Sequence, residues 1–233
     1  MSFTADDVRG RICVIFDFDG TIADTMSRIC AKAREILLEY GLTDEEIGDI
    51  RRIVGPPFPQ AFSIIYGFSE EQAAEIAAKY RRSYKDGLGV EAWPCFDGIP
   101  EALIKLRSEG CELAVASSKG QYLVDQAVDD NAIRHLFTAI EGKRSDEEND
   151  KVQAIQHVIE TVSRKLEGEG QPPLVLDDCV MVGDRFYDIE AADAVGIPCI
   201  GVTWGGTCER EELETAGAAI IVDTPEQLVR AIL

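Results

Sequence analysis

Short apolar runs and amphipathic stretches alternate along most of the chain. The apolar runs lie at residues 12–16, 113–116, 137–140, 180–182, 199–202 and 219–222. The first is apolar on both faces, which is typical of a buried strand in a parallel sheet. Helical patterns separate the later runs, at residues 99–108, 120–129, 152–166, 189–195 and 209–215, and Thr224 with Pro225 opens a last helix. Strands that alternate with helices form βαβ units, so the pattern predicts an α/β fold with a doubly wound, mostly parallel, Rossmann-like sheet.

The stretch between the first two strands follows a helical pattern only. Apolar residues recur at helical spacing over residues 26–40, and capping signals at Thr43 and Ser69 begin further helices. No strand pattern lies between these helices. The sequence therefore predicts a core domain made of residues 1–23 and 96–233, with an all-helical domain of residues 24–95 inserted after the first strand.

Charge and cysteine usage narrow the class of protein. The 233 residues carry a formal net charge of −20, which argues against nucleic acid or an anionic membrane as a partner. No apolar run reaches the length of a membrane span, and the first residues do not read as a signal peptide. The seven cysteines contain no Cys-x-x-Cys pair, and several stand inside apolar runs, as expected in a reducing compartment. We therefore expect a cytoplasmic protein.

The end of the first strand carries the most informative group of polar residues. Asp17 and Asp19 follow the apolar run, and alternation along an extended backbone places both carboxylates on one side. Two carboxylates so close repel each other, and a hard dication such as Mg²⁺ would relieve that repulsion. Gly20 allows a sharp turn whose amides point at an anion. A plain strand end followed by an Asx turn is the alternative.

Three further segments carry polar groups suited to the same chemistry. Ser117 and Ser118 end the second strand, where a hydroxyl can bind a phosphate oxygen or cap a helix. Lys151 begins a helix, where a lysine is electrostatically unfavourable unless an anion lies nearby, although a solvated surface charge is the simpler interpretation. Asp184 and Asp188 follow the strand at 180–182, and their convergence with the first pair would be costly without a metal ion.

These residues together resemble the four motifs of the haloacid dehalogenase superfamily, in the same order. The motifs are Asp-Phe-Asp-Gly-Thr, a hydroxyl after the second strand, a lysine, and Gly-Asp-Arg-x-x-Asp. Ile-Val-Gly-Pro-Pro, Tyr-Gly-Phe-Ser-Glu-Glu, Met-Val-Gly-Asp-Arg and the segment Ile-Val-Asp-Thr-Pro-Glu-Gln-Leu resemble the phosphoglycolate-phosphatase-like branch, and the helical insert resembles its C1-type cap. One residue departs from the pattern, since Val152 replaces the proline that often follows the lysine. Lys143 is therefore the alternative to Lys151.

The resemblance implies a Mg²⁺-dependent phosphomonoesterase that acts on a small phosphorylated metabolite. Asp17 would be the nucleophile that forms an aspartyl phosphate, and Asp19 the general acid and base. The metal ligands implied are Asp17, Asp19 through its backbone carbonyl, Asp184 and Asp188, the last through a water molecule. The implied phosphate-binding groups are Ser117, Ser118, Lys151 and the turn at Gly20 and Thr21. The cap would close over the substrate on hinges near residues 23–26 and 86–96.

The motifs leave the substrate and some other functions open. Phosphoglycolate would need a cation such as Arg51, whereas a nucleoside monophosphate would use an aromatic surface such as Phe58, Phe62 or Tyr66. An ordinary solvated helix residue accounts for Arg51 at least as well, and cap core accounts for the aromatic residues better than a binding surface does. Pyrophosphate is a third substrate class, and a homodimer is left open.

Other activities fit the motifs less well. A β-phosphoglucomutase-like phosphotransferase ranks lower, because the segment near Ile29 lacks the histidine of those enzymes. A phospho-receiver would not carry the helical insert or the adjacent Asp-x-Asp. An inactive scaffold is disfavoured, because every motif residue is present.

Overall fold

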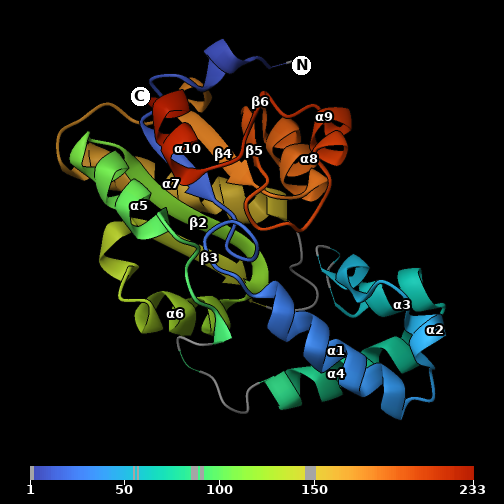
Figure 1. Cartoon of the computed structure of the whole chain (residues 1–233). Coiled ribbons are helices and arrows are strands. Elements are labelled where there is room, and N and C mark those ends of the chain that lie inside the picture. Colours follow the sequence, from blue (N-terminus) through green and yellow to red (C-terminus); the bar gives the residue numbers. More distant parts are fainter. Residues whose placement is uncertain (1–2, 55, 57, 85–88, 90–91, 145–150) are drawn as a thin grey trace. The chain divides into compact units, whose positions relative to one another are not determined.

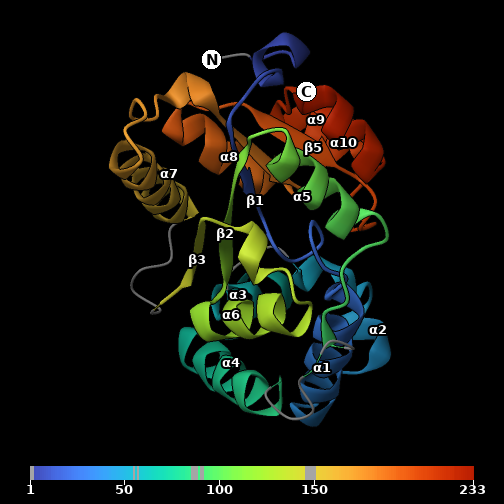
Figure 2. The ribbon, with the colours of Figure 1, turned by 90° about the vertical axis from the view of Figure 1, so that its left-hand side faces the viewer.

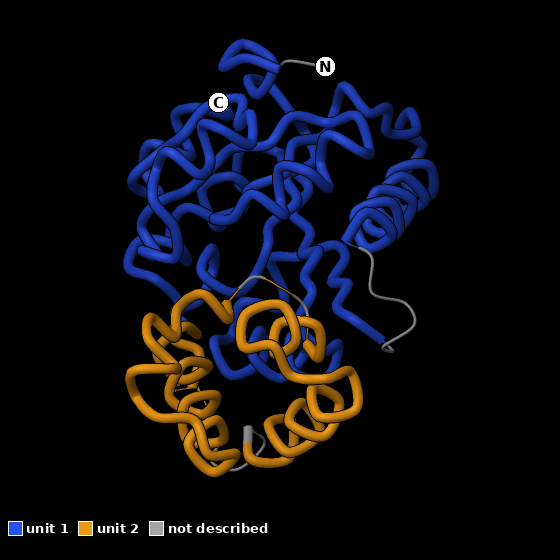
Figure 3. Tube along the Cα trace, turned by 90° about the vertical axis from the view of Figure 1, so that its right-hand side faces the viewer, with its two compact units in different colours: residues 1–24, 95–233 blue, residues 25–94 orange. Residues whose placement is uncertain are grey.

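The chain forms two compact units in its computed structural model (Figure 3). The structure describes residues 3–54, 56, 58–84, 89, 92–144 and 151–233. Unit 1 comprises Met1–Asp24 and Cys95–Leu233, and unit 2 comprises Thr25–Pro94. Gly55 and Pro57 of the Ile-Val-Gly-Pro-Pro motif, and residues 145–150, which precede Lys151, lie outside the described residues.

A parallel sheet of six strands forms the centre of unit 1, in the order β3-β2-β1-β4-β5-β6 (Figure 1). The strands are β1 (Cys13–Phe16), β2 (Glu112–Gly120), β3 (Ala139–Lys143), β4 (Cys179–Gly183), β5 (Cys199–Val202) and β6 (Ile220–Val222). All five strand pairings are parallel. The predicted doubly wound α/β fold is confirmed. The main difference is β2, which continues four residues beyond the apolar run that predicted it.

Helices cover both faces of this sheet. They are α5 (Ile99–Ser108), α6 (Gln121–Asp130), α7 (Lys151–Gly168), α8 (Phe186–Val195), α9 (Arg210–Ala216) and α10 (Pro225–Ile232), with short 3-10 helices at Ala5–Val8, Arg134–Leu136 and Leu176–Asp178. Buried residues of α7, α8 and α9 pack with Ile15, Ala114 and Met181 on one face. The alternate strand residues are also buried and point to the other face. Figure 2 shows α5 and α7 on opposite sides of the sheet.

Unit 2 contains helices only among its described residues. They are α1 (Met26–Glu39), α2 (Asp44–Ile47), the 3-10 helix Ile50–Ile53, α3 (Gln60–Tyr66) and α4 (Glu70–Tyr84). Thr43 accepts a hydrogen bond from the amide of Glu46 at 3.3 Å, and Ser69 accepts one from Gln72 at 3.2 Å, so both predicted capping signals form. Ile36, Leu37, Phe62, Ile76 and Trp93 are among its fully or almost fully buried side chains. None of the helices in the described part of either unit has the length and apolar character that a membrane crossing requires.

Candidate active site

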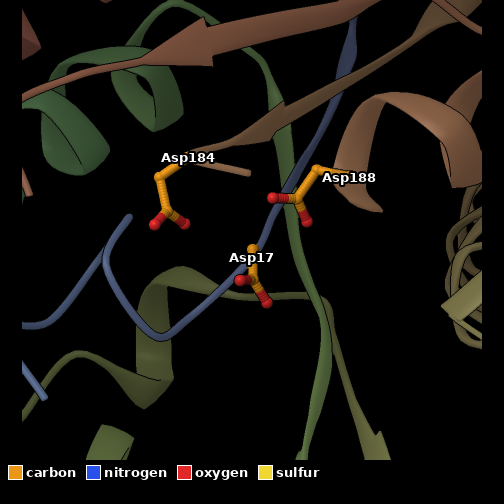
Figure 4. A group of neighbouring side chains, drawn as sticks. All are labelled: Asp17, Asp184 and Asp188. Carbon is orange, nitrogen blue, oxygen red and sulfur yellow. The ribbon is translucent and has the colours of Figure 1, made fainter. Parts of the chain in front are cut away.

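Three buried aspartates meet at the carboxyl ends of β1 and β4 (Figure 4). Phe16 of β1 pairs with Val182 of β4, so the residues that follow the two strands emerge side by side. Asp17 directly follows β1, Asp184 follows β4, and Asp188 lies in the first turn of α8. Each contributes one carboxylate oxygen to a group in which all three atoms lie within 4.8 Å of one another. Side chains far apart in the sequence therefore converge because parallel strands end at the same edge of the sheet.

Two glycines allow the carboxylates to approach the backbone. Gly20 has φ +83°, and a Cβ atom there would lie 2.2 Å from Oδ2 of Asp184. A Cβ on Gly183 would lie 2.2 Å from the carboxyl carbon of Asp188. A side chain at either position would displace a member of the cluster, so both glycines are required by the close approach.

The hydrogen bonds of the cluster leave two buried carboxylate oxygens without a hydrogen-bond partner among the described residues, Oδ1 of Asp17, which lies 3.0 Å from the ammonium of Lys151, and Oδ2 of Asp184. Thr21 donates from its hydroxyl to Oδ1 of Asp184 at 2.9 Å, and the amide of Arg185 donates to Oδ2 of Asp188 at 3.0 Å. Oδ2 of Asp184 is buried and accepts no hydrogen bond from any described residue. An unpartnered buried carboxylate oxygen is costly, and this one lies in a set of oxygen donors that a hard dication can bind.

The electrostatics of the cluster also favour a bound dication. Burial, followed by repulsion from Asp188 and Asp17, raises the pKa of Asp184 to about 8. Burial also raises the pKa of Asp17 to about 6, although the nearby Lys151 opposes this shift. Three ionised carboxylates and one ammonium would leave two uncompensated negative charges. The three residues thus fit a divalent cation, whose charge would reverse both pKa shifts.

Lys151 lies inside this cluster. Its ammonium is 3.0 Å from Oδ1 of Asp17 and forms a close ion pair with Asp188. Burial alone would lower the pKa of Lys151, but the two carboxylates raise it, so the lysine is charged. Lys143, the alternative, ends β3 and lines a cavity of about 440 Å³ together with Lys151 and Ser117. Lys151 is therefore the predicted phosphate lysine that pairs with Asp17 and Asp188.

The remaining predicted site residues lie in different surroundings. Ser117 is buried and accepts a hydrogen bond from the amide of Lys119 at 3.3 Å, whereas Ser118 is exposed. The carboxylate of Asp19 does not join the cluster of three, because it pairs with the ammonium of Lys119. Arg51 lies in unit 2, where it pairs with Asp49 at 2.8 Å. The phosphate-binding roles of Ser117, Ser118 and Arg51 stay predictions.

The loop after β5 is a part of the site that the sequence analysis missed. Trp204 donates from its indole N–H to the carbonyl of Thr21 at 2.9 Å. A Cβ on Gly205 would lie 2.4 Å from the carbonyl oxygen of Gly20, so this glycine packs directly on the turn after β1. Cys208 donates from its thiol to the carbonyl of Asp184 at 2.9 Å. A Trp-Gly-Gly segment that begins two residues after the end of a predicted strand was the available signal.

Comparison with known proteins places the chain in a family. Residues 14–202 match the model of haloacid dehalogenase-like hydrolases, and the chain belongs to that family. It is 33% identical over 198 residues to a 5'-nucleotidase of Pseudomonas aeruginosa, covering 85% of each chain. It is 26% identical to a phosphoglycolate phosphatase of Synechococcus elongatus, covering 94% of this chain and 96% of that one. The predicted resemblance is confirmed.

Two further matches extend the comparison. A tyrosine-protein kinase of Mycobacterium tuberculosis is 34% identical over 82% of this chain, which spans 62% of the length of that kinase. A solved structure described as a predicted phosphatase from Clostridium acetobutylicum superimposes with a TM-score of 0.79 at 31% identity, covering 94% of this chain and 97% of that one. With the site above, family and relatives make this chain a hydrolase of the phosphatase type.

Proposed function

We propose that the protein is a Mg²⁺-dependent phosphomonoesterase that works through an aspartyl phosphate on Asp17. The observation that carries this proposal is the buried group of Asp17, Asp184 and Asp188 with Lys151 against two of its carboxylates. A carboxylate nucleophile must be ionised, and burial works against this by raising its pKa to about 6. Lys151 and a bound dication would both favour the ionised form.

The site would hold the metal on carboxylate oxygens. Asp17, Asp184 and Asp188 supply the ligand set, and the carbonyl of Asp19 is a further candidate. A bound Mg²⁺ would supply charge neutralisation for the transferred phosphoryl group. The unpartnered Oδ2 of Asp184 supports this assignment, because it accepts no hydrogen bond from the described chain.

The chain's own residues would carry out two half-reactions. In the first, an oxygen of Asp17 bonds to phosphorus, the ester P–O bond breaks, and the leaving oxygen takes a proton from Asp19. In the second, water attacks the phosphorus, the bond to Asp17 breaks, and Asp19 takes the proton of the water. The proton then serves the next ester. Lys151 and Ser117 would bind the phosphoryl oxygens in both steps.

The substrate would be a small phosphorylated metabolite. The relatives named 5'-nucleotidase and phosphoglycolate phosphatase support a nucleoside monophosphate and phosphoglycolate as first candidates. We further propose that unit 2 is the cap that selects the leaving group, with residues 24–95 as the predicted extent. Arg51 would then be the candidate for binding a substrate carboxylate.

A second candidate function is phosphoryl transfer to a hydroxyl other than water. The relative named tyrosine-protein kinase favours it, since a phosphoaspartate could pass its phosphoryl group to another acceptor. Phosphate release in water distinguishes the two functions. A phosphatase releases one inorganic phosphate for every ester cleaved, whereas a transferase gives less phosphate than alcohol and a phosphorylated acceptor.

The test is phosphate release from a panel of phosphomonoesters and one phosphoanhydride, with Mg²⁺ and with EDTA. The panel contains phosphoglycolate, nucleoside monophosphates, sugar phosphates and pyrophosphate. We expect Asp17→Asn to lose activity by about 1000-fold or more, because the nucleophile is gone. Asp177→Asn is the matched control, since the carboxylate of Asp177 is almost fully exposed in the same unit. An Asp17→Asn variant as active as the wild type would contradict the proposed mechanism.

A further inference from the structure

Lys119 is a buried cation at the site that the mechanism above does not use. Its ammonium lies 2.9 Å from Oδ1 and 3.2 Å from Oδ2 of Asp19, so it contacts both oxygens of that carboxylate. The side chain of Lys119 is 5% exposed, and that of Asp19 is 20% exposed. One hundred residues separate the partners in sequence. The pair forms because β2 continues past its apolar run, and alternation turns Lys119 to the same side as Ser117.

The backbone that carries Lys119 is held on its other side by β3. Gln121 accepts a hydrogen bond from the amide of Gly142 at 2.7 Å and donates one to the carbonyl of Ile140 at 3.2 Å. A Cβ on Gly142 would lie 2.7 Å from the carbonyl oxygen of Lys119. The absence of a side chain at Gly142 therefore lets β3 close onto the Lys119 peptide, which fixes the base of the lysine side chain.

We propose that Lys119 is a positioning residue that sets the orientation of the Asp19 carboxylate for proton transfer. This rests on the proposed function, in which Asp19 is the general acid and base. Asp19 lies near Asp17 and repels it, so an unheld carboxylate would turn away from the reacting oxygen or toward the metal ligands. A cation that contacts both of its oxygens restricts that rotation.

The second half-reaction depends most on this orientation. Water attacks the phosphorus of the aspartyl phosphate while its proton moves to the ionised carboxylate of Asp19, and the P–O bond to Asp17 breaks. A good leaving group such as p-nitrophenolate departs without a proton, so its expulsion in the first half-reaction needs Asp19 far less. Loss of Lys119 should therefore slow hydrolysis of the phosphoenzyme and spare its formation from p-nitrophenyl phosphate.

The experiment follows p-nitrophenolate release by stopped flow in Lys119→Met, with Mg²⁺ present. We expect a burst close to one product per site at a rate within about threefold of the wild type, followed by turnover slowed about 10- to 100-fold. For alkyl phosphates, which need a proton in both half-reactions, kcat should fall at least as far while KM changes little. Lys119→Arg keeps a cation and should recover part of the turnover rate.

Two further variants separate positioning from general damage. Lys165→Met is the matched control, because it removes a lysine paired with the buried carboxylate of Glu112 at 2.8 Å, at the other end of β2, and should keep wild-type kinetics. Adding Lys119→Met to Asp19→Asn should cost little more than Asp19→Asn alone, since the two act as a unit.

The outcomes distinguish this inference from the proposed function. A wild-type chain without Mg²⁺- and Asp17-dependent phosphate release would overturn both. If the wild type is active but Lys119→Met slows the burst as much as the turnover, or leaves both rates unchanged, only the role of Lys119 is overturned. Full additivity with Asp19→Asn would also exclude it.

Discussion

The buried ion pairs at the candidate site of unit 1 contrast with three exposed ion pairs of unit 2. In unit 1, the ion pairs of Lys151 with Asp17 and Asp188 are almost inaccessible to solvent. In unit 2, the pairs Arg51–Asp49, Arg34–Asp44 and Lys79–Glu39 are all well exposed. Exposed pairs each contribute at most about 1 kcal/mol, whereas a buried charge left without its partner costs about 3–5 kcal/mol. The chain thus keeps an electrostatically unfavourable cluster at the place where the proposed reaction needs one.

The largest effect is expected from removing a negative charge of the buried cluster. We expect Asp184→Asn to lower activity about 100- to 1000-fold and to weaken Mg²⁺ binding in calorimetry, because the carboxylate with the unpartnered oxygen is lost. Without metal at pH 8, the same variant should melt about 2–8 °C above the wild type, because a buried repelling charge is removed. Lower stability than the wild type under these conditions would contradict this account of the cluster.

The same pKa shifts make the stability of the metal-free protein depend on pH. The folded-state pKa of Asp184 is about 8 and that of Asp17 about 6, both above the usual aspartate value of 3.8. A group whose pKa is higher in the folded state than in the unfolded state stabilises the fold at pH values below its unfolded pKa. This contribution to stability is lost as the pH rises through the folded-state pKa. In EDTA, Tm should therefore fall between about pH 5 and pH 8.5. Mg²⁺ should reverse the fall at pH 8, and Asp184→Asn should reduce it; a flat profile in EDTA would contradict both shifts.

Two glycines with similar backbone conformations, one in each unit, allow a matched test of the site. Gly20 has φ +83° and Gly41 has φ +90°, so alanine at either position carries a similar conformational cost of about 1–2 kcal/mol. Their surroundings differ, because a Cβ on Gly20 would lie 2.2 Å from Asp184, whereas a Cβ on Gly41 would meet no atom within 4 Å. Gly20→Ala should therefore lower kcat about 100-fold or more, and Gly41→Ala should leave kcat unchanged while it loses only the conformational part of the stability. Equal activity in the two variants would show that the turn tolerates a side chain.

The fold was largely readable from the sequence because its signals are local. The apolar runs, the helical periodicity and the capping residues Thr43 and Ser69 depend on neighbouring residues, and each forms in the structure. Four of the predicted site residues, Asp17, Asp184, Asp188 and Lys151, also lie together in the structure, because parallel strand ends meet at one edge of the sheet, whereas their roles stay predictions.

The missed parts of the site depend on contacts between distant segments. Lys119 reaches Asp19 only because β2 extends beyond its apolar run, and a polar extension has no hydrophobic signal. Trp204 and Gly205 pack on the turn after β1 from a loop nearly two hundred residues away in the sequence. No periodic pattern in a single sequence signals contacts of this kind.

The smallest effect is expected in unit 2, at Arg51. Its pair with Asp49 is exposed on both sides, so Arg51→Met should change the free energy of unfolding by less than about 0.5 kcal/mol. If Arg51 binds a substrate carboxylate, KM for phosphoglycolate should rise about tenfold, the equivalent of ~1.4 kcal/mol, with nucleoside monophosphates unaffected. Arg34→Met is the control, because it removes another exposed pair of the same unit, with Asp44. If KM for every ester is unchanged from the wild type in both variants, Arg51 is an ordinary solvated arginine, and leaving-group selection belongs to other residues of unit 2.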